Sequence, residues 1–282
     1  MRAKGLVVLG MAVFYLAAII SIRAQQPFVT DDTDIVEKGN VELEFLNEFD
    51  RLHKFEYPET YQNESEATLT FGINKRVEVA VAGTFLSVYS AEAPRSIGGI
   101  GDTEFEIKYN FRHDKKHSYL PAMAVSFIVQ APTGSATRGL GSGVTNIGIR
   151  GLAQKQIGEK NTFRVNGGYL FSGNTIVGDL GITAVRGHIF TGSASYVRKI
   201  NDKLQLGGEF SGAVSSKFVL NEGQLQVRFG GNYQITKKTS IDVAVAAGKF
   251  SASPRFALLI GFTRDLGSFI PHHHHKIDDP ND

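Results

Sequence analysis

Histidine is the side chain that most often acts as a general base in catalysis. In a hydrolase, such a histidine lies beside a nucleophile and is oriented by a carboxylate. The candidates outside the C-terminal tract are His53, His113, His117 and His188. They fall in separate segments and no Ser/His/Asp spacing joins them, so the sequence predicts that the protein is not an enzyme.

Two glycine-rich stretches and a histidine tract could bind a cofactor or a metal ion. Gly99-Ile100-Gly101 and the stretch 139–143 lack the Lys-Ser/Thr and the helical pattern that follow a phosphate-binding loop. We therefore expect no cofactor there. Four adjacent histidines could hold Zn²⁺, Ni²⁺ or Cu²⁺ loosely; they are His272, His273, His274 and His275. No second ligand set accompanies them, so a solvated native tail or a vector-derived remnant is the simpler interpretation.

Charged side chains alternate with apolar ones along much of the chain. In residues 103–111, Phe105 and Ile107 have one parity, and Glu104, Glu106 and Lys108 have the other. On a helix these apolar residues would scatter around the axis, whereas on a strand they form one face. The segment is therefore predicted to be a strand with one apolar face and one polar face.

The same alternation predicts about twelve strands. They cover residues 41–51, 66–73, 77–86, 103–111, 122–131, 146–154, 163–171, 188–197, 204–211, 224–234, 241–248 and 256–263. Short links that mostly carry lysine alternate with longer links rich in Gly, Ser and Asn, such as 87–101 and 173–187. This layout is typical of an all-β protein, a single up-and-down antiparallel transmembrane β-barrel with periplasmic termini.

An exported, soluble β-sandwich is the alternative fold for these strands. Its links would not alternate so regularly in length, and its aromatic residues would not gather near strand ends. In this chain, aromatic residues such as Phe71, Phe111 and Tyr196 lie toward strand ends, as they do in the interfacial girdles of membrane barrels. The barrel is therefore the favoured prediction.

The chain begins with the pattern of an export signal. Arg2 and Lys4 precede an uncharged, mostly apolar stretch, and Ala24 offers a cleavage site before Gln25. The apolar stretch is also close to the length of a membrane-spanning helix, so an uncleaved anchor stays open. We expect a signal peptide (residues 1–24), a periplasmic N-terminal segment (25–40), an outer-membrane barrel (41–263) and a polar, His-rich, disordered tail (264–282).

Composition excludes several other classes of protein. The chain has no cysteine, which excludes disulfides, thiolate metal sites and a lipidated cysteine. The formal net charge is +2, and removal of Arg2, Lys4 and Arg23 with the leader changes it to −1. Such a balance gives no sign of a nucleic-acid-binding protein.

The polar parity of the strands would line the interior of the barrel. The predicted pore-lining residues are Glu42, Glu44, Glu66, Glu78, Glu104, Glu106, Lys108, Arg150, Arg164, Glu209, Arg228 and Asp242. The acidic ones come mainly from the first four strands, and the arginines come from later ones. Two interpretations stay open. The charges could pair across the lumen and plug it, because unpaired buried charges are costly, or they could line a narrow, wet passage.

Several short motifs resemble a known family. They are Gly99-Ile100-Gly101-Asp102, Pro132-Thr133-Gly134, Gly139-Leu140-Gly141-Ser142-Gly143, Asn166-Gly167-Gly168-Tyr169 and the opening Gln26-Pro27-Phe28-Val29-Thr30-Asp31-Asp32, with Glu209 in a late strand. Together they are similar to the bacterial outer-membrane family labelled for the meta-cleavage pathway of phenol degradation. The resemblance implies a barrel of about twelve strands that acts as a transporter or channel for small, aromatic or hydrophobic molecules.

We therefore expect an outer-membrane channel for the passive or facilitated passage of small molecules. The alternative is a barrel that transports nothing and has a structural or surface-interaction role. The expected partners are outer-membrane lipid, small-molecule solutes and the barrel-insertion machinery, without nucleic acid. The expected location is the bacterial outer membrane, because the export signal and the alternating strands together imply export and membrane insertion.

Overall fold

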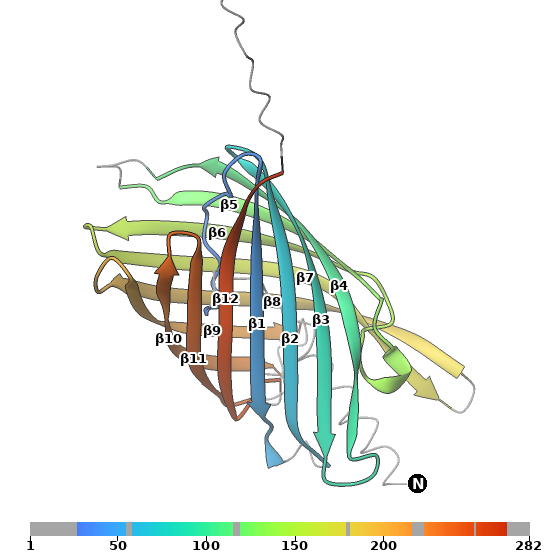
Figure 1. The fold of residues 1–282 in the computed structure, drawn as a ribbon. Helices are drawn as coiled ribbons and strands as arrows, with labels where there is room; N and C mark the ends of the chain where they lie inside the picture. Colours follow the sequence, from blue (N-terminus) through green and yellow to red (C-terminus); the bar gives the residue numbers. More distant parts are fainter. Residues whose placement is uncertain are drawn as a thin grey trace, which may run out of the picture.

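A computed structural model describes residues 27–54, 58–114, 119–178, 181–215, 223–250 and 252–269. The expected signal peptide and the histidine tract therefore lie outside the described residues. Within the described ranges, twelve strands form a closed antiparallel barrel, in which each strand pairs with its sequence neighbours and β1 pairs with β12 (Figure 1). None of the helices in these ranges is long and apolar enough to cross a membrane.

The strand bounds show how the chain is laid out around the barrel. They are β1 (Asn40–Arg51), β2 (Glu59–Asn74), β3 (Val77–Ser90), β4 (Ser96–Arg112), β5 (Ala122–Ala131), β6 (Asn146–Ile157), β7 (Asn161–Gly178), β8 (Gly181–Lys199), β9 (Leu204–Ser215), β10 (Gln224–Thr236), β11 (Thr239–Gly248) and β12 (Phe256–Ser268). The first residue of β1, Asn40, pairs with the last residue of β12, Ser268. The end of the barrel at which β1 begins and β12 ends is called the terminal end, and the opposite end is called the loop end.

The two parities of each strand have opposite surroundings. In β4, the side chains of Phe105 and Ile107 are 50% and 51% exposed, whereas Glu104 and Glu106 are 6% and 5% exposed. The apolar parity thus forms the outer surface of the barrel, and the polar parity faces the lumen. This arrangement confirms the predicted all-β, up-and-down antiparallel barrel, because a sandwich would bury the apolar parity instead.

The strands are longer at the loop end than the sequence pattern predicts. The stretch 173–187 is predicted to be a long link, yet β7 and β8 continue through it, from the pair Gly173 and Arg186 to the pair Gly178 and Gly181. The apolar alternation marks only the part of a strand that has one apolar face. In this stretch, residues such as Asn174, Ile176 and Val177 do not alternate regularly between polar and apolar, so the sequence gives no strand signal although the hydrogen-bonded ladder continues.

The last strand also extends past its predicted end. The sequence pattern places residues 264–268 in the tail, but they belong to β12. Four of them pair with the start of β1, and Arg264 also pairs with Thr239 of β11. In this stretch Leu266 has 51% of its side chain exposed, so the outward parity persists. The barrel therefore extends five residues beyond the predicted boundary at residue 263.

Candidate functional site

The inward parity places all twelve predicted pore-lining residues on the wall of the lumen. Nine of them are buried: Glu78, Glu104, Glu106, Lys108, Arg150, Arg164, Glu209, Arg228 and Asp242. Glu42, Glu44 and Glu66 are only partly buried. The structure adds an element that sequence reasoning missed.

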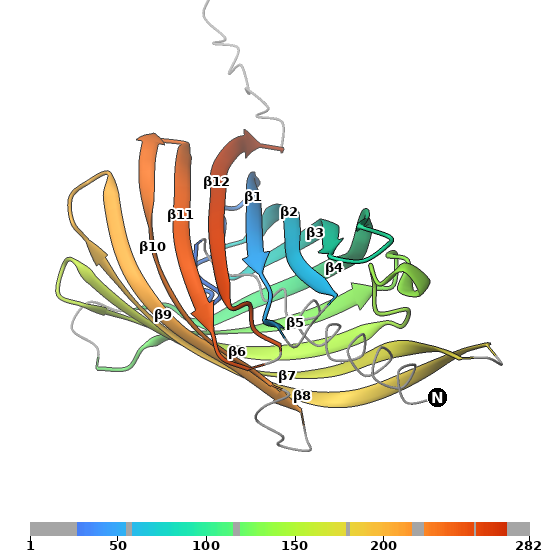
Figure 2. The same cartoon turned by 90° about the horizontal axis from the view of Figure 1, so that it is seen from below.

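That element is the N-terminal stretch of residues 27–36, which we call the plug segment. It lies inside the ring of strands (Figure 2), and its residues Phe28, Thr30 and Thr33 are almost fully buried. The sequence assigns residues 25–40 to a periplasmic segment, and the structure differs from that expectation. The segment has no alternation, so no periodic pattern reveals which surface it contacts.

The first half of the plug segment is held by β9 and β10. The Arg228 guanidinium donates a hydrogen bond to the Pro27 carbonyl at 3.0 Å and also pairs with the Glu48 carboxylate at 3.2 Å. The Glu209 carboxylate accepts a hydrogen bond from the Thr30 backbone N–H. Lumen-facing charges therefore bind the backbone groups that a segment without a strand partner would otherwise leave unsatisfied.

The second half of the plug segment is held by β2, β3 and β4. The Asn110 amide donates to the Thr33 carbonyl, and the Glu78 carboxylate accepts the Val36 backbone N–H at 2.7 Å. At Gly72, an added Cβ atom would lie 2.3 Å from the Val36 carbonyl oxygen. Glycine at this position therefore allows the segment to pass close against the wall as it leads into β1.

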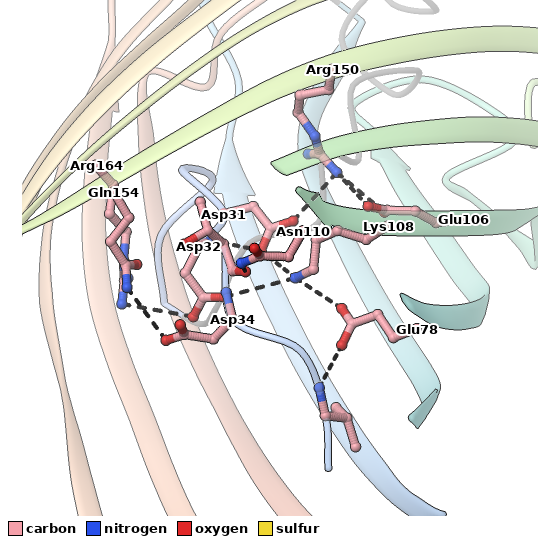
Figure 3. A network of polar contacts seen from close by, with 12 residues as sticks. Asp31, Asp32, Asp34, Glu78, Glu106, Lys108, Asn110, Arg150, Gln154 and Arg164 are labelled. Atoms are coloured by element: carbon pink, nitrogen blue, oxygen red, sulfur yellow. Dashed lines mark hydrogen bonds and ion pairs between the residues drawn. The ribbon is translucent and has the colours of Figure 1, made fainter. Parts of the chain in front are cut away.

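Two consecutive carboxylates of the plug segment meet three cations of the wall (Figure 3). Asp31 lies 3.5 Å from the Lys108 ammonium and 3.7 Å from the Arg150 guanidinium. Asp32 lies 3.7 Å from Lys108 and 3.8 Å from Arg164. The cations come from β4, β6 and β7, which lie on one side of the barrel wall, so the two carboxylates bridge cations of nearby strands.

The same cations also pair with carboxylates of the wall itself. The Lys108 ammonium lies 2.8 Å from Glu78, and the Arg150 guanidinium lies 3.1 Å from Glu106. These distances are shorter than the contacts to Asp31 and Asp32. Because a buried charge is stable only when it is paired, the wall pairs satisfy Lys108 and Arg150 even without the plug segment.

A cavity of about 190 Å³ remains beside the plug segment. Its charged lining residues are Asp31, Asp32, Asp34, Glu42, Glu44, Glu78, Glu106 and Lys108. It lies between the segment and the wall formed by β1 to β4. This cavity is thus small and its charged lining is mostly acidic.

The link between β5 and β6 contacts β4 at the loop end. The Asp102 carboxylate accepts the backbone N–H groups of Gly134, at 3.0 Å, and of Ser142, at 2.7 Å. An added Cβ atom at Gly134 would lie 2.3 Å from the Leu140 carbonyl oxygen, and one at Gly141 would lie 2.4 Å from the Asp102 carboxylate. Three of the glycine-rich motifs, at residues 99–102, 132–134 and 139–143, therefore meet at one packed junction.

The described histidines do not converge on a catalytic arrangement. His188 stacks on Tyr169 at the outer surface, with ring centroids 5.8 Å apart, and His113 is exposed in the link after β4. His53 follows β1 at the loop end, and His117 lies outside the described residues. In the part of the chain that the structure describes, no group of three or more His, Cys, Asp or Glu side chains is placed to hold a metal ion.

The closed barrel with an apolar outer face and a charged lumen defines an outer-membrane β-barrel of the porin and channel type. The sequence model of the Phenol_MetA_deg family, described as the MetA-pathway of phenol degradation, matches residues 27–263. The chain therefore belongs to this family, as its glycine-rich motifs suggest. Among curated proteins, none matches the chain.

Solved structures with a similar fold include an outer-membrane channel and two porins. The COG4313 outer-membrane channel from Pseudomonas putida F1 superposes with a TM-score of 0.67 and 14% identity, over 83% of this chain and 98% of that chain. The NanC porin gives a TM-score of 0.55 and 10% identity, over 79% of this chain and 100% of that one. The KdgM porin gives a TM-score of 0.50 and 9% identity, over 79% of this chain and 98% of that one. At these identities the likeness establishes the fold.

Proposed function

We propose that the protein is a gated channel of the bacterial outer membrane for the passive or facilitated passage of small molecules. The observation that carries the proposal is the content of the lumen. A charged wall encloses a segment of the same chain, which is held by hydrogen bonds and ion pairs. The plug segment closes the passage in this state, and its departure opens it.

The contacts of the plug segment suit an element that leaves and returns. Its two carboxylates contact the wall cations at 3.5–3.8 Å, whereas the wall pairs of Lys108 and Arg150 measure 2.8 and 3.1 Å. Departure of the segment therefore leaves both cations paired. The loss is mainly a set of buried polar contacts rather than an apolar core. Water that enters the lumen as the segment leaves can replace hydrogen bonds of this kind.

The size of the barrel also supports a passage. Side chains fill the lumen of an eight-stranded barrel, whereas barrels of sixteen strands or more enclose an aqueous channel. Twelve strands lie between these limits, so a ten-residue segment is a sufficient plug. The family description names phenol degradation, which supports small aromatic molecules as candidates for the transported class.

A barrel that transports nothing is the second candidate, and one observation favours it. The plug segment is bound along its whole length, from the Arg228 contact at Pro27 to the Glu78 contact at Val36. A permanent filling would show the same contacts. The two functions differ in whether the segment moves.

A single cysteine tests that motion without background, because the chain has no cysteine of its own. Thr33, fully buried in the plug segment, is replaced by cysteine in the parent and in an Asp31→Asn/Asp32→Asn variant. We expect a charged methanethiosulfonate reagent to modify the variant at least tenfold faster than the parent. Equal, negligible rates in both proteins would support the permanently filled barrel. A cysteine at exposed Tyr119 is the matched control and should react equally in both.

Location and processing follow from the same proposal. The folded protein should fractionate with outer membranes, and an unheated sample should migrate faster on a gel than a boiled one. Mass spectrometry of the purified protein should show cleavage near Ala24. Recovery in the soluble periplasm would contradict the proposed location.

A further inference from the structure

The three cations that contact the plug segment form one cluster on the lumen wall. Lys108, Arg150 and Arg164 are all more than nine-tenths buried. We propose that this cluster is a binding site for a small organic dicarboxylate that enters the channel, and that Asp31 and Asp32 occupy the site in the closed state. The inference rests on the proposed channel function and adds a substrate class to it.

The geometry of the cluster matches two carboxylates. Asp31 bridges Lys108 and Arg150, and Asp32 bridges Lys108 and Arg164. Lys108 is thus shared, and each carboxylate has an arginine of its own. Because guanidinium groups present planar sets of donors that fit carboxylates, a molecule with two neighbouring carboxylates can reproduce all four contacts.

The positions of the arginine side chains are fixed by partners on the wall. The Arg164 Nε donates to the Gln154 side-chain oxygen at 2.8 Å, and the Arg150 guanidinium is hydrogen-bonded to Glu106. Arg150 keeps its Glu106 contact when the segment leaves, and Arg164 keeps Gln154 as a partner, although the Gln154 amide also donates a hydrogen bond to Asp34 of the segment at 3.3 Å. The wall thus orients both arginines in advance, and a preorganised site loses little free energy on binding.

The charge of the site permits a dianion despite the acidic residues nearby. Glu78 and Glu106 pair with the cluster, and Asp31 and Asp32 add two more carboxylates in the closed state. A dicarboxylate that replaces the segment adds no more negative charge than the segment contributes. The contacts of the segment, at 3.5–3.8 Å, are also longer than charge-assisted hydrogen bonds of good geometry, which leaves room for a better-fitting ligand.

Calorimetric titration of the purified full-length protein in detergent at low ionic strength tests the site. The probe is phthalate, which has two neighbouring carboxylates on a rigid ring, and the control is phthalamide, its neutral analogue of the same shape. In the Asp31→Asn/Asp32→Asn variant, which weakens the hold of the segment on the cluster, we expect phthalate to bind at least tenfold more tightly than in the parent. Benzoate, with one carboxylate, should bind at least fivefold more weakly than phthalate.

A third substitution locates the probe within the lumen. Arg164→Gln, added to the variant, should weaken phthalate binding about tenfold, because one of the two carboxylates loses its arginine. Equal binding of phthalate and phthalamide, equal phthalate affinity in parent and variant, or no effect of Arg164→Gln would each overturn the proposal. If the double variant does not show the gel mobility of a folded barrel, Asp32→Asn alone is titrated in its place, with the same criteria.

Channel recordings separate this inference from the proposed function. In planar bilayers the variant should conduct KCl, and phthalate should block that current reversibly. A KCl current with no phthalate block and no phthalate binding refutes the dicarboxylate site and leaves the channel intact. Absence of any current contradicts the proposed channel function. The calorimetric titration alone then shows whether the cluster binds a dicarboxylate.

Discussion

The Thr30 backbone N–H donates a hydrogen bond to the Glu209 carboxylate, although the two residues are 179 positions apart in the chain. Thr30 belongs to the plug segment and Glu209 to β9, so this contact joins the first described residues to the far wall of the lumen. Both residues are buried. The interior of the barrel is therefore organised around the N-terminal stretch, and in the proposed channel the position of this stretch decides whether the lumen is filled or open.

The outward face of β4 should tolerate no charge. Ile107→Arg should lower the free energy of unfolding in lipid vesicles by about 2–4 kcal/mol, because an arginine near the middle of the lipid-facing band must leave water. Ile107→Leu, which keeps an apolar side chain at this exposed position, is the control and should change stability little. Denaturant titration of vesicle-inserted protein gives both values. Unchanged stability of the arginine variant would show that this parity does not face lipid.

The ion pair of Glu106 and Arg150, at 3.1 Å, should stabilise the folded barrel, with each side chain lowering the cost of burying the other's charge. Each single substitution, Glu106→Gln or Arg150→Gln, leaves one buried charge with fewer partners and should destabilise the barrel. The double substitution should cost less than the sum, with a coupling of about 1–3 kcal/mol. Denaturant titration of the four proteins measures it. Additive effects would mean that the two side chains do not stabilise each other.

Glycine should be required at the junction of the β5–β6 link. Gly141→Ala places a Cβ atom 2.4 Å from the Asp102 carboxylate, so we expect a loss of about 1–3 kcal/mol from the resulting crowding. Gly83→Ala is the matched control, because an added Cβ there has nothing within 4 Å. Limited proteolysis of the link 132–145 and denaturant titration should both single out Gly141→Ala. Equal behaviour of the two variants would refute the packed junction.

Arg164 of β7 and Arg228 of β10, whose side chains face the lumen, should set the ion selectivity of the open channel. Replacing Arg164 and Arg228 by alanine in the Asp31→Asn/Asp32→Asn variant removes positive charge, so conductance should rise and selectivity should shift toward cations. The shift should weaken at 1 M salt, where screening limits the reach of the remaining carboxylates to about 3 Å. Lys155→Ala, which breaks a partly exposed pair with Asp114, is the control. Reversal potentials that do not change would place both arginines off the path.

The sequence predicts the strands of the barrel wall but does not predict the plug segment that lies in the lumen. Alternation places Phe105 outside and Glu106 inside because a strand of the barrel wall has lipid on its outer face and the polar lumen on its inner face. The position of Thr30 against Glu209 has no such signal, since the contact is made by a backbone N–H between distant segments. The one sequence signal for the plug segment is its three aspartates at positions 31, 32 and 34, which could pair with the arginines of later strands.

Single-channel recording in planar bilayers tests the gated channel most directly. The parent should be closed for most of the time, and the Asp31→Asn/Asp32→Asn variant should open at least ten times more often with the same unitary conductance, because the barrel wall is unchanged. The same open probability in both proteins, or no current from either after correct folding is confirmed by gel mobility, would contradict a lumen that the plug segment opens and closes.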